Sequence, residues 1–146
     1  MISVNDERLA TSLGYALVRA FRQVNRFSGR ALQPFGLSAE QAHILMVLWL
    51  EGSMKVGHLQ RLLMLSSATL TGALDRMEKQ KLCRRVDDPE DRRAYRVEPV
   101  PMDARTRRRI EAALEEVERD AFAALSAKER AELLRLLDKV SSSLPA

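Results

Sequence analysis

Cysteine, aromatic residues and long apolar runs are scarce in this chain of 146 residues. Its single cysteine, Cys83, cannot form a disulfide within the chain, which favours a reducing compartment and a cytoplasmic location. The longest apolar stretch, residues 42–50, is far too short to cross a bilayer. The first residues contain no basic region followed by an apolar core, so we expect no secretion signal. The length fits a single domain, residues 1–146.

Patterns typical of catalytic and metal sites are also missing. The two histidines, His43 and His58, lie in different predicted helices, and we find no set of ligands at the spacing of a zinc site. No serine, histidine and aspartate order, no carboxylate pair and no phosphate-binding loop stands out. We therefore expect no enzymatic activity, no metal ion and no cofactor.

Positive charge is concentrated in one part of the chain. The formal net charge is +4 and the isoelectric point is about 9.6. Residues 76–109 carry twelve lysines and arginines against seven acids, whereas residues 110–146 carry five against eight. This asymmetry favours a nucleic-acid surface with a separate, acidic end, although a solvated basic surface would give the same counts.

Apolar periodicity and capping residues predict a mainly α-helical chain with a small β-hairpin. Ser38 and Gln41 form one capping box, and Ser126 and Glu129 form another. We expect helices over about residues 9–31, 38–50, 55–64, 103–125 and 126–144, a further helix that begins at Ser66, and strands over 82–86 and 95–99.

The helices at the two ends of the chain carry apolar stripes wider than one small domain needs. They flank a compact centre of three helices and a hairpin, residues 38–100. We therefore expect residues 5–32 and 104–144 to form the interface of a homodimer.

Residues 65–97 carry the most specific pattern. Ser66 and Thr69 open the third central helix, Asp75-Arg76-x-Glu78 lies near its end, and Asp-Pro-x-Asp-Arg-Arg occupies 88–93. This combination resembles the multiple-antibiotic-resistance regulator (MarR) family of bacterial transcription factors, and the similarity extends over the whole chain. The resemblance implies a winged helix-turn-helix in a cytoplasmic, homodimeric regulator, most often a repressor, on palindromic double-stranded DNA.

The resemblance also implies where DNA is bound. Asp91 and Arg93 match the family's Asp-x-Arg wing motif, in which the arginine probes the minor groove. In the helix, hydroxyl groups are expected at phosphates, and small side chains are expected at base edges. The expected DNA-binding residues are Ser66, Ser67, Ala68, Thr69, Thr71, Arg76, Asp91, Arg92 and Arg93.

The wing loop is acidic although the segment around it is basic. We expect Asp88 and Pro89 to shape the turn. We expect the other loop acids to pair with Arg84, Arg85 and Arg76, and so to fix the wing against the helix. The acids would then hold the loop while its arginines bind DNA.

Three positions depart from the family pattern. Lys81 replaces a glycine and must adopt a left-handed conformation or extend the helix. Pro99-Val100-Pro101 replaces a Leu-Thr pair after the second strand, and Lys55 stands near the usual cap of the short helix. These changes concern the setting of the wing relative to the dimer helices.

An aromatic or phenolic effector is a further implication of the resemblance. Candidate pocket residues are Tyr15, Arg19, Arg22, His43 and Trp49. A solvated basic helix face with a core tryptophan would explain the same residues. Two other functions stay open: a thiol-based redox sensor that uses Cys83, and a winged-helix protein-interaction module without DNA binding.

Overall fold

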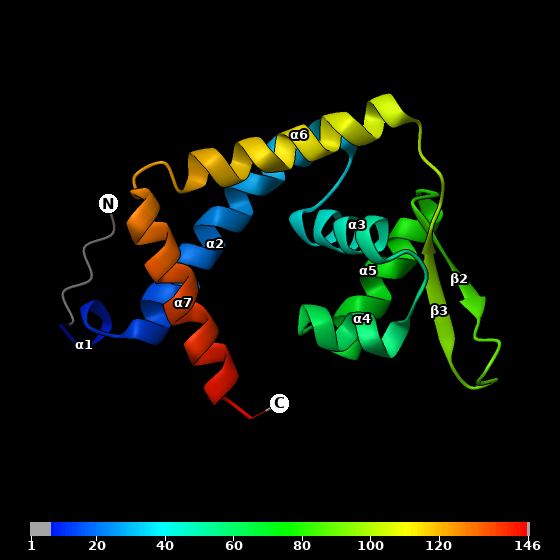
Figure 1. Cartoon of the computed structure of the whole chain (residues 1–146), viewed down its shortest axis with the longest axis horizontal. Coiled ribbons are helices and arrows are strands. Elements are labelled where there is room, and N and C mark those ends of the chain that lie inside the picture. The colour runs from blue at the N-terminus through cyan, green and yellow to red at the C-terminus, as the bar shows by residue number, and fades with distance from the viewer. Residues whose placement is uncertain (1–6, 146) are drawn as a thin grey trace.

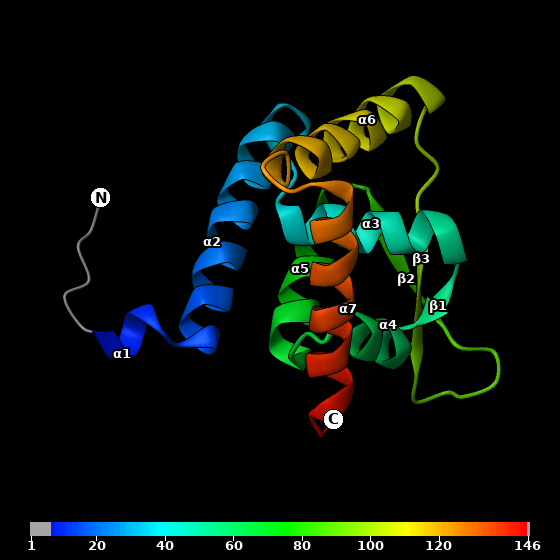
Figure 2. The same cartoon turned by 60° about the vertical axis from the view of Figure 1, so that its left-hand side comes forward.

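A computed structural model of the chain describes residues 7–145 (Figure 1). The predicted interface segment 5–32 is therefore described from Glu7 onward, because residues 1–6 lie outside the described part. Figures 1 and 2 show α1 and the loop of the β-hairpin at opposite ends of the molecule. The chain is mainly helical with a small antiparallel sheet, as the sequence predicts.

The elements form a helical arm, which comes from residues 7–32 and 104–143, and a central lobe, residues 39–99, between these two segments. In chain order they are α1 (Glu7–Ala10), α2 (Leu13–Leu32), the 3-10 helix η1 (Gln33–Phe35), α3 (Ala39–Glu51), β1 (Met54–Lys55), α4 (Val56–Leu63), α5 (Ser67–Lys79), β2 (Cys83–Asp87), β3 (Tyr95–Pro99), α6 (Ala104–Ala121) and α7 (Ala127–Ser143). Helix α6 packs against α2 and returns the chain to the arm (Figure 1).

The predicted helix starts are confirmed where a capping side chain marks them. The Ser38 hydroxyl accepts from the Gln41 amide at 3.1 Å, and the Gln41 side chain accepts from the Ser38 amide at 3.0 Å. Ser126 and Glu129 make the same reciprocal pair at 3.2 and 2.8 Å. Asp103 caps α6 by accepting from the Thr106 amide. Each cap satisfies helix N–H groups that have no partner within the helix.

Two predicted helix boundaries are wrong. The first predicted helix is interrupted after Ala10, because the Ser12 hydroxyl accepts from the Tyr15 amide and caps a new helix. The long helix ends at Ala121 rather than near Leu125, and a turn connects it to the Ser126 cap.

The sheet has three strands, where the sequence predicts two. The strand order is β1-β3-β2, and Met54 in β1 pairs with Val97 in β3. A strand of two residues is too short to give an alternating pattern. Because β1 pairs with β3, the hairpin of β2 and β3 is joined to the residues that precede α4.

Lys81 adopts the first of its two predicted alternatives, a left-handed conformation with φ of 58°. The Lys81 amide donates to the Glu78 carbonyl and the Leu82 amide donates to the Met77 carbonyl, which closes the end of α5. A left-handed residue other than glycine costs roughly 1–2 kcal/mol. Helix α5 therefore turns into the wing without a glycine.

Most of the hydrophobic core lies in the central lobe, and Leu32 of α2 and Ile110 of α6 also belong to it. Its largest fully buried side chains include Leu45 and Leu48 of α3, Leu74 and Met77 of α5, and Val97 of β3. The arm is different. No described residue of α7 is buried, and the described buried residues of α2 are Ser28 and Leu32. No helix within residues 7–145 is both long and apolar enough to cross a membrane.

Candidate nucleic-acid interface

Helix α5 presents a small, polar face to solvent. Its apolar side chains Leu70, Leu74 and Met77 are buried, as the sequence predicts. The opposite side exposes six of the candidate DNA-binding residues, namely Ser66, Ser67, Ala68, Thr69, Thr71 and Arg76. An exposed helix with short side chains allows close approach of its backbone to another surface.

The hydroxyl groups at the start of α5 are held by local hydrogen bonds. The Ser66 hydroxyl accepts from the Thr69 amide at 3.1 Å and donates to the Thr69 hydroxyl at 2.7 Å. The Ser67 hydroxyl donates to the Gln60 side chain in α4 at 3.2 Å. These contacts fix the hydroxyl groups at the helix start while the side chains stay exposed.

The wing loop joins β2 to β3, and its acids bond to the loop backbone. The Asp88 side chain accepts from the Glu90 amide at 2.8 Å, and the Asp91 side chain accepts from the Arg93 amide at 2.9 Å. The Ala94 amide also donates to the Asp91 carbonyl. Both carboxylates therefore shape the turn, which leaves the arginine side chains at its tip, Arg92 and Arg93, exposed.

The predicted pairing of the wing-loop acids with nearby arginines is wrong, although the wing and the helix are joined by ion pairs. Among the described residues, no salt bridge joins a loop acid to Arg84, Arg85 or Arg76. Arg85 instead pairs with two acids of α5: its guanidinium lies 2.8 Å from Asp75 and also contacts Glu78. Arg84 pairs across the hairpin with Glu98. The helix thus supplies the acids and the wing supplies the arginine.

Asp88 is the one loop acid that is buried within the described chain, with 3% of its surface exposed. Its Oδ2 atom lies 3.6 Å from the Lys55 ammonium and 3.7 Å from the Arg96 guanidinium, without a hydrogen bond. The Arg96 guanidinium also donates to the Ser53 carbonyl and hydroxyl. The backbone hydrogen bond from Glu90 and the two cations hold the pKa of Asp88 below its ordinary value. These partners of Asp88 could not be predicted from the sequence, and they anchor the wing to the turn before α4.

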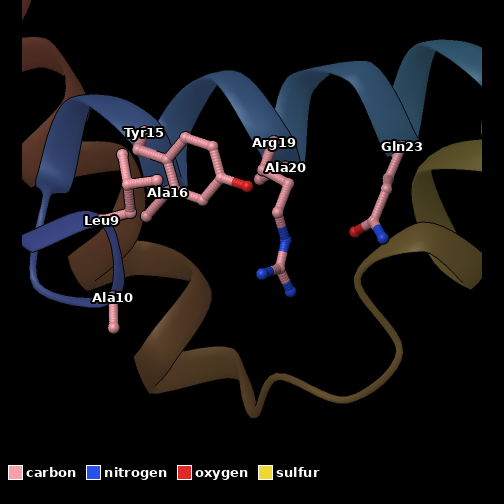
Figure 3. A pocket seen from close by; sticks show the side chains of 7 residues that line it. All are labelled: Leu9, Ala10, Tyr15, Ala16, Arg19, Ala20 and Gln23. Carbon is pink, nitrogen blue, oxygen red and sulfur yellow. The ribbon is translucent and has the colours of Figure 1, made fainter. Parts of the chain in front are cut away.

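The candidate effector residues are not brought together within one chain. Tyr15 and Arg19 line a cleft of about 390 Å³ on the arm, and Figure 3 shows their side chains and that of Gln23 projecting from α2 into the same space. Arg22 is exposed on α2 and does not line this cleft. His43 is exposed on α3, and Trp49 packs against the Arg107 guanidinium, which lies 4.9 Å from the centre of its ring.

Cys83 lies in β2 with only 2% of its surface exposed. Burial, followed by the nearby Glu78 carboxylate, raises the pKa of the Cys83 thiol to about 11. A thiol of this kind is protonated at neutral pH, and the thiolate is the reactive form. Residues 7–145 contain no cluster of three or more histidine, cysteine or acidic side chains arranged to hold a metal ion.

Comparison with known proteins gives one match over the lobe and others over more than nine tenths of the chain. The sequence model of the MarR family matches residues 37–95. The HTH-type transcriptional regulator MgrA of Staphylococcus aureus is 30% identical over 137 residues, which are 93% of this chain and 92% of MgrA.

Two solved structures have the same fold. BpsR of Bordetella bronchiseptica, whose DNA binding is regulated by 6-hydroxynicotinic acid, gives a TM-score of 0.83 at 24% identity over 92% of this chain and 96% of its own. A variant of MarR from E. coli, complexed with operator DNA, gives a TM-score of 0.76 at 23% identity over 91% of this chain and 94% of its own. Because the match to MgrA spans nearly all of both chains, this protein belongs to the MarR family, whose members are DNA-binding transcription regulators and not enzymes.

Proposed function

We propose that the protein is a homodimeric, effector-responsive repressor that binds a palindromic operator in the cytoplasm. The observation that carries the DNA-binding part is the Arg85 contact with Asp75 and Glu78. It makes one rigid unit of the exposed face of α5 and the arginine-tipped wing. A helix and a wing held at fixed spacing can occupy a major groove and the neighbouring minor groove of one duplex.

Within the lobe of residues 38–100, the two elements have different roles. The Ser66 and Thr69 hydroxyls face phosphates, and Ser67, Ala68 and Thr71 face base edges. Arg76, Arg92 and Arg93 supply positive charge, and Asp91 holds the turn that carries Arg93. Since the exposed face offers no arginine, asparagine or glutamine before Arg76, DNA shape contributes much of the specificity.

The arm, residues 5–32 and 104–144, forms the dimer interface. Its apolar side chains are exposed in a single chain: Leu13 is 87% exposed and Phe21 is 63% exposed. Helix α7 exposes Leu133, Leu136, Leu137 and Val140, and Leu144 directly after it is also exposed. In proteins, most of the stability of an amphipathic helix comes from the packing of its apolar face. A second copy that covers these faces supplies the missing burial, and it places two lobes about a two-fold axis.

The effector is an aromatic or phenolic acid that binds on the arm. Tyr15 and Arg19 line the cleft there, and the arginine offers a partner for a carboxylate. Regulation of BpsR by 6-hydroxynicotinic acid supports this class of ligand. The rival switch, oxidation of Cys83, is disfavoured by the burial and raised pKa of its thiol. The rival without DNA binding does not explain the exposed arginines of the wing.

Selection of duplexes from a random pool, followed by footprinting, tests this proposal. Two recognition helices related by a two-fold axis should protect two half-sites about 10 base pairs apart, with the wings on the flanking minor grooves. Recovery of no preferred duplex would remove the proposal in favour of a protein-interaction module.

A further inference from the structure

A basic cleft lies between α4 and the wing. Of the residues that line it, Arg93 is the one proposed above to contact DNA. Its volume is about 330 Å³. The lining residues are Lys55, Val56, Gly57, His58, Arg61, Arg93, Ala94 and Tyr95. Three of them are lysine or arginine, one is histidine, one carries a phenol hydroxyl, and none is acidic. Such a concentration of donors and positive charge in one concave surface suits a phosphate.

The cleft walls are held by contacts on both sides. Lys55 ends β1, which pairs with β3, and its ammonium group lies 3.6 Å from the buried carboxylate of Asp88. On the wing side, Asp91 fixes the backbone at Arg93. The two walls therefore keep a set distance although the side chains are largely exposed.

The first turn of α4 is open toward the Arg61 side chain. Gly57 has no side chain, and a Cβ atom at that position would lie 3.8 Å from the Arg61 guanidinium. Lys55, the residue at the helix cap, makes no side-chain hydrogen bond to the first turn. The Arg61 guanidinium therefore lies beside Gly57 in the first turn of α4, and the N–H groups of that turn donate to no capping side chain. A guanidinium group and the N–H groups at a helix start both attract an anion.

We propose that this cleft binds a backbone phosphate of the DNA duplex, at the strand that separates the groove entered by α5 from the groove entered by the wing. The inference rests on the proposed function and adds Lys55, His58 and Arg61 to the DNA-binding surface. The first helix of a helix-turn-helix crosses the DNA backbone, and α4 is that helix here. Because a phosphate carries no sequence information, these residues set affinity and orientation, and do not set sequence preference.

Salt dependence distinguishes this role from base recognition. Each phosphate neutralised by a protein cation steepens the fall of log K with log salt concentration by about 0.9. Arg61→Gln should therefore reduce the slope by about one per subunit, both on a selected operator and on a mixed-sequence duplex of about three helical turns. The ratio of the two affinities should stay the same.

The experiment is a fluorescence anisotropy titration of labelled duplexes over a series of chloride concentrations, without phosphate buffer. Lys128→Gln is the matched control, since it also removes one exposed positive charge but lies in α7, at the other end of the molecule (Figure 1). Thermal melting of both variants checks that they fold.

The proposed phosphate site would be overturned if Arg61→Gln and Lys128→Gln gave the same slope of log K against log salt concentration, and if Arg61→Gln bound DNA as tightly as the unmodified protein does. A loss of operator preference at unchanged slope would overturn it too, because Arg61 would then contact bases. Failure of the unmodified protein to bind either duplex would instead remove the proposed function, so the two failures are distinguishable.

Discussion

The backbone amide of Arg85 in β2 donates to the Glu78 carboxylate in α5 at 2.7 Å, and the Arg85 guanidinium pairs with the other oxygen of the same carboxylate. The wing therefore cannot rotate away from the helix as a unit without breaking both contacts. The same guanidinium reaches Asp75 one turn earlier in α5. These contacts of Glu78 and Asp75 with Arg85 set the angle between the two elements that we propose to contact DNA.

Glu78→Gln tests the contact between Glu78 and Arg85, because glutamine keeps an acceptor but loses the charge. We expect affinity for a selected operator to fall about tenfold, the equivalent of about 1.4 kcal/mol and below the full value of a charged hydrogen bond because the pair is partly exposed. Glu98→Gln is the control, since it removes the partner of Arg84 on the same hairpin. Equal losses of operator affinity in the two variants, measured by anisotropy at fixed salt, would mean that the contact between Glu78 and Arg85 has no special role.

The dimer is tested by sedimentation at micromolar concentration. The unmodified protein should sediment at about twice the chain mass of 16.5 kDa. Leu137→Glu should shift it to the mass of one chain, because a charge on the exposed apolar face of α7 cannot be buried without a partner. Leu62→Glu, which alters an exposed leucine on α4 outside the proposed interface, should leave the dimer intact. A monomer in the unmodified protein would remove the two-half-site arrangement.

Effector binding is tested with salicylate as the probe. Ligand at about one hundred times its Kd should raise the free energy of unfolding by about 2.7 kcal/mol, which thermal melting detects. It should also weaken operator binding, because a ligand that favours one spacing of the lobes shifts the population of dimers. Arg19→Gln should abolish both responses and leave basal operator affinity unchanged, whereas Arg22→Gln, outside the cleft, should keep them. Loss of both responses in Arg22→Gln alone would place the site elsewhere.

Cys83 should react slowly with a thiol reagent at neutral pH, and peroxide should leave operator affinity unchanged. Its pKa is raised in the folded protein, so the folded state keeps the proton that the unfolded chain loses near pH 9. The stabilising contribution is therefore complete below pH 9 and is lost as the pH rises toward 11. Denaturation over this range should show a steeper alkaline loss in the unmodified protein than in Cys83→Ser. A peroxide response that Cys83→Ser lacks would favour the thiol sensor.

The features that could be predicted from the sequence are local ones. Ser38, Ser66 and Ser126 mark helix starts because each bonds to a backbone amide three residues later, and both partners are visible in a short segment. The buried face of α5 follows from periodicity for the same reason. The cap at Ser12 could not be predicted, because the apolar stripe continues across the break between α1 and α2.

The contacts that could not be predicted join residues far apart in the chain. The pairing of Asp88 with Lys55 depends on β1 lying next to β3, and a strand of two residues leaves no pattern to place it. The pairing of Arg85 with Glu78 depends on which side of β2 its side chain occupies. Charge counts indicated a basic segment but could not assign partners within it.

The acids of the wing loop are proposed to hold the arginines that bind DNA, and Asp91 is the acid that bonds to the backbone of Arg93. The measurement is a titration of one selected operator, at fixed salt, with Asp91→Ala and Asp91→Asn beside the unmodified protein. Arg93→Ala serves as a reference that should cost about 1–3 kcal/mol per subunit. Asparagine keeps an oxygen that accepts from the Arg93 amide, whereas alanine removes it. We predict weaker binding by Asp91→Ala, and binding by Asp91→Asn that equals or exceeds that of the unmodified protein because a charge near phosphate is lost. Tighter binding by Asp91→Ala would show that the acid only opposes DNA and does not position Arg93.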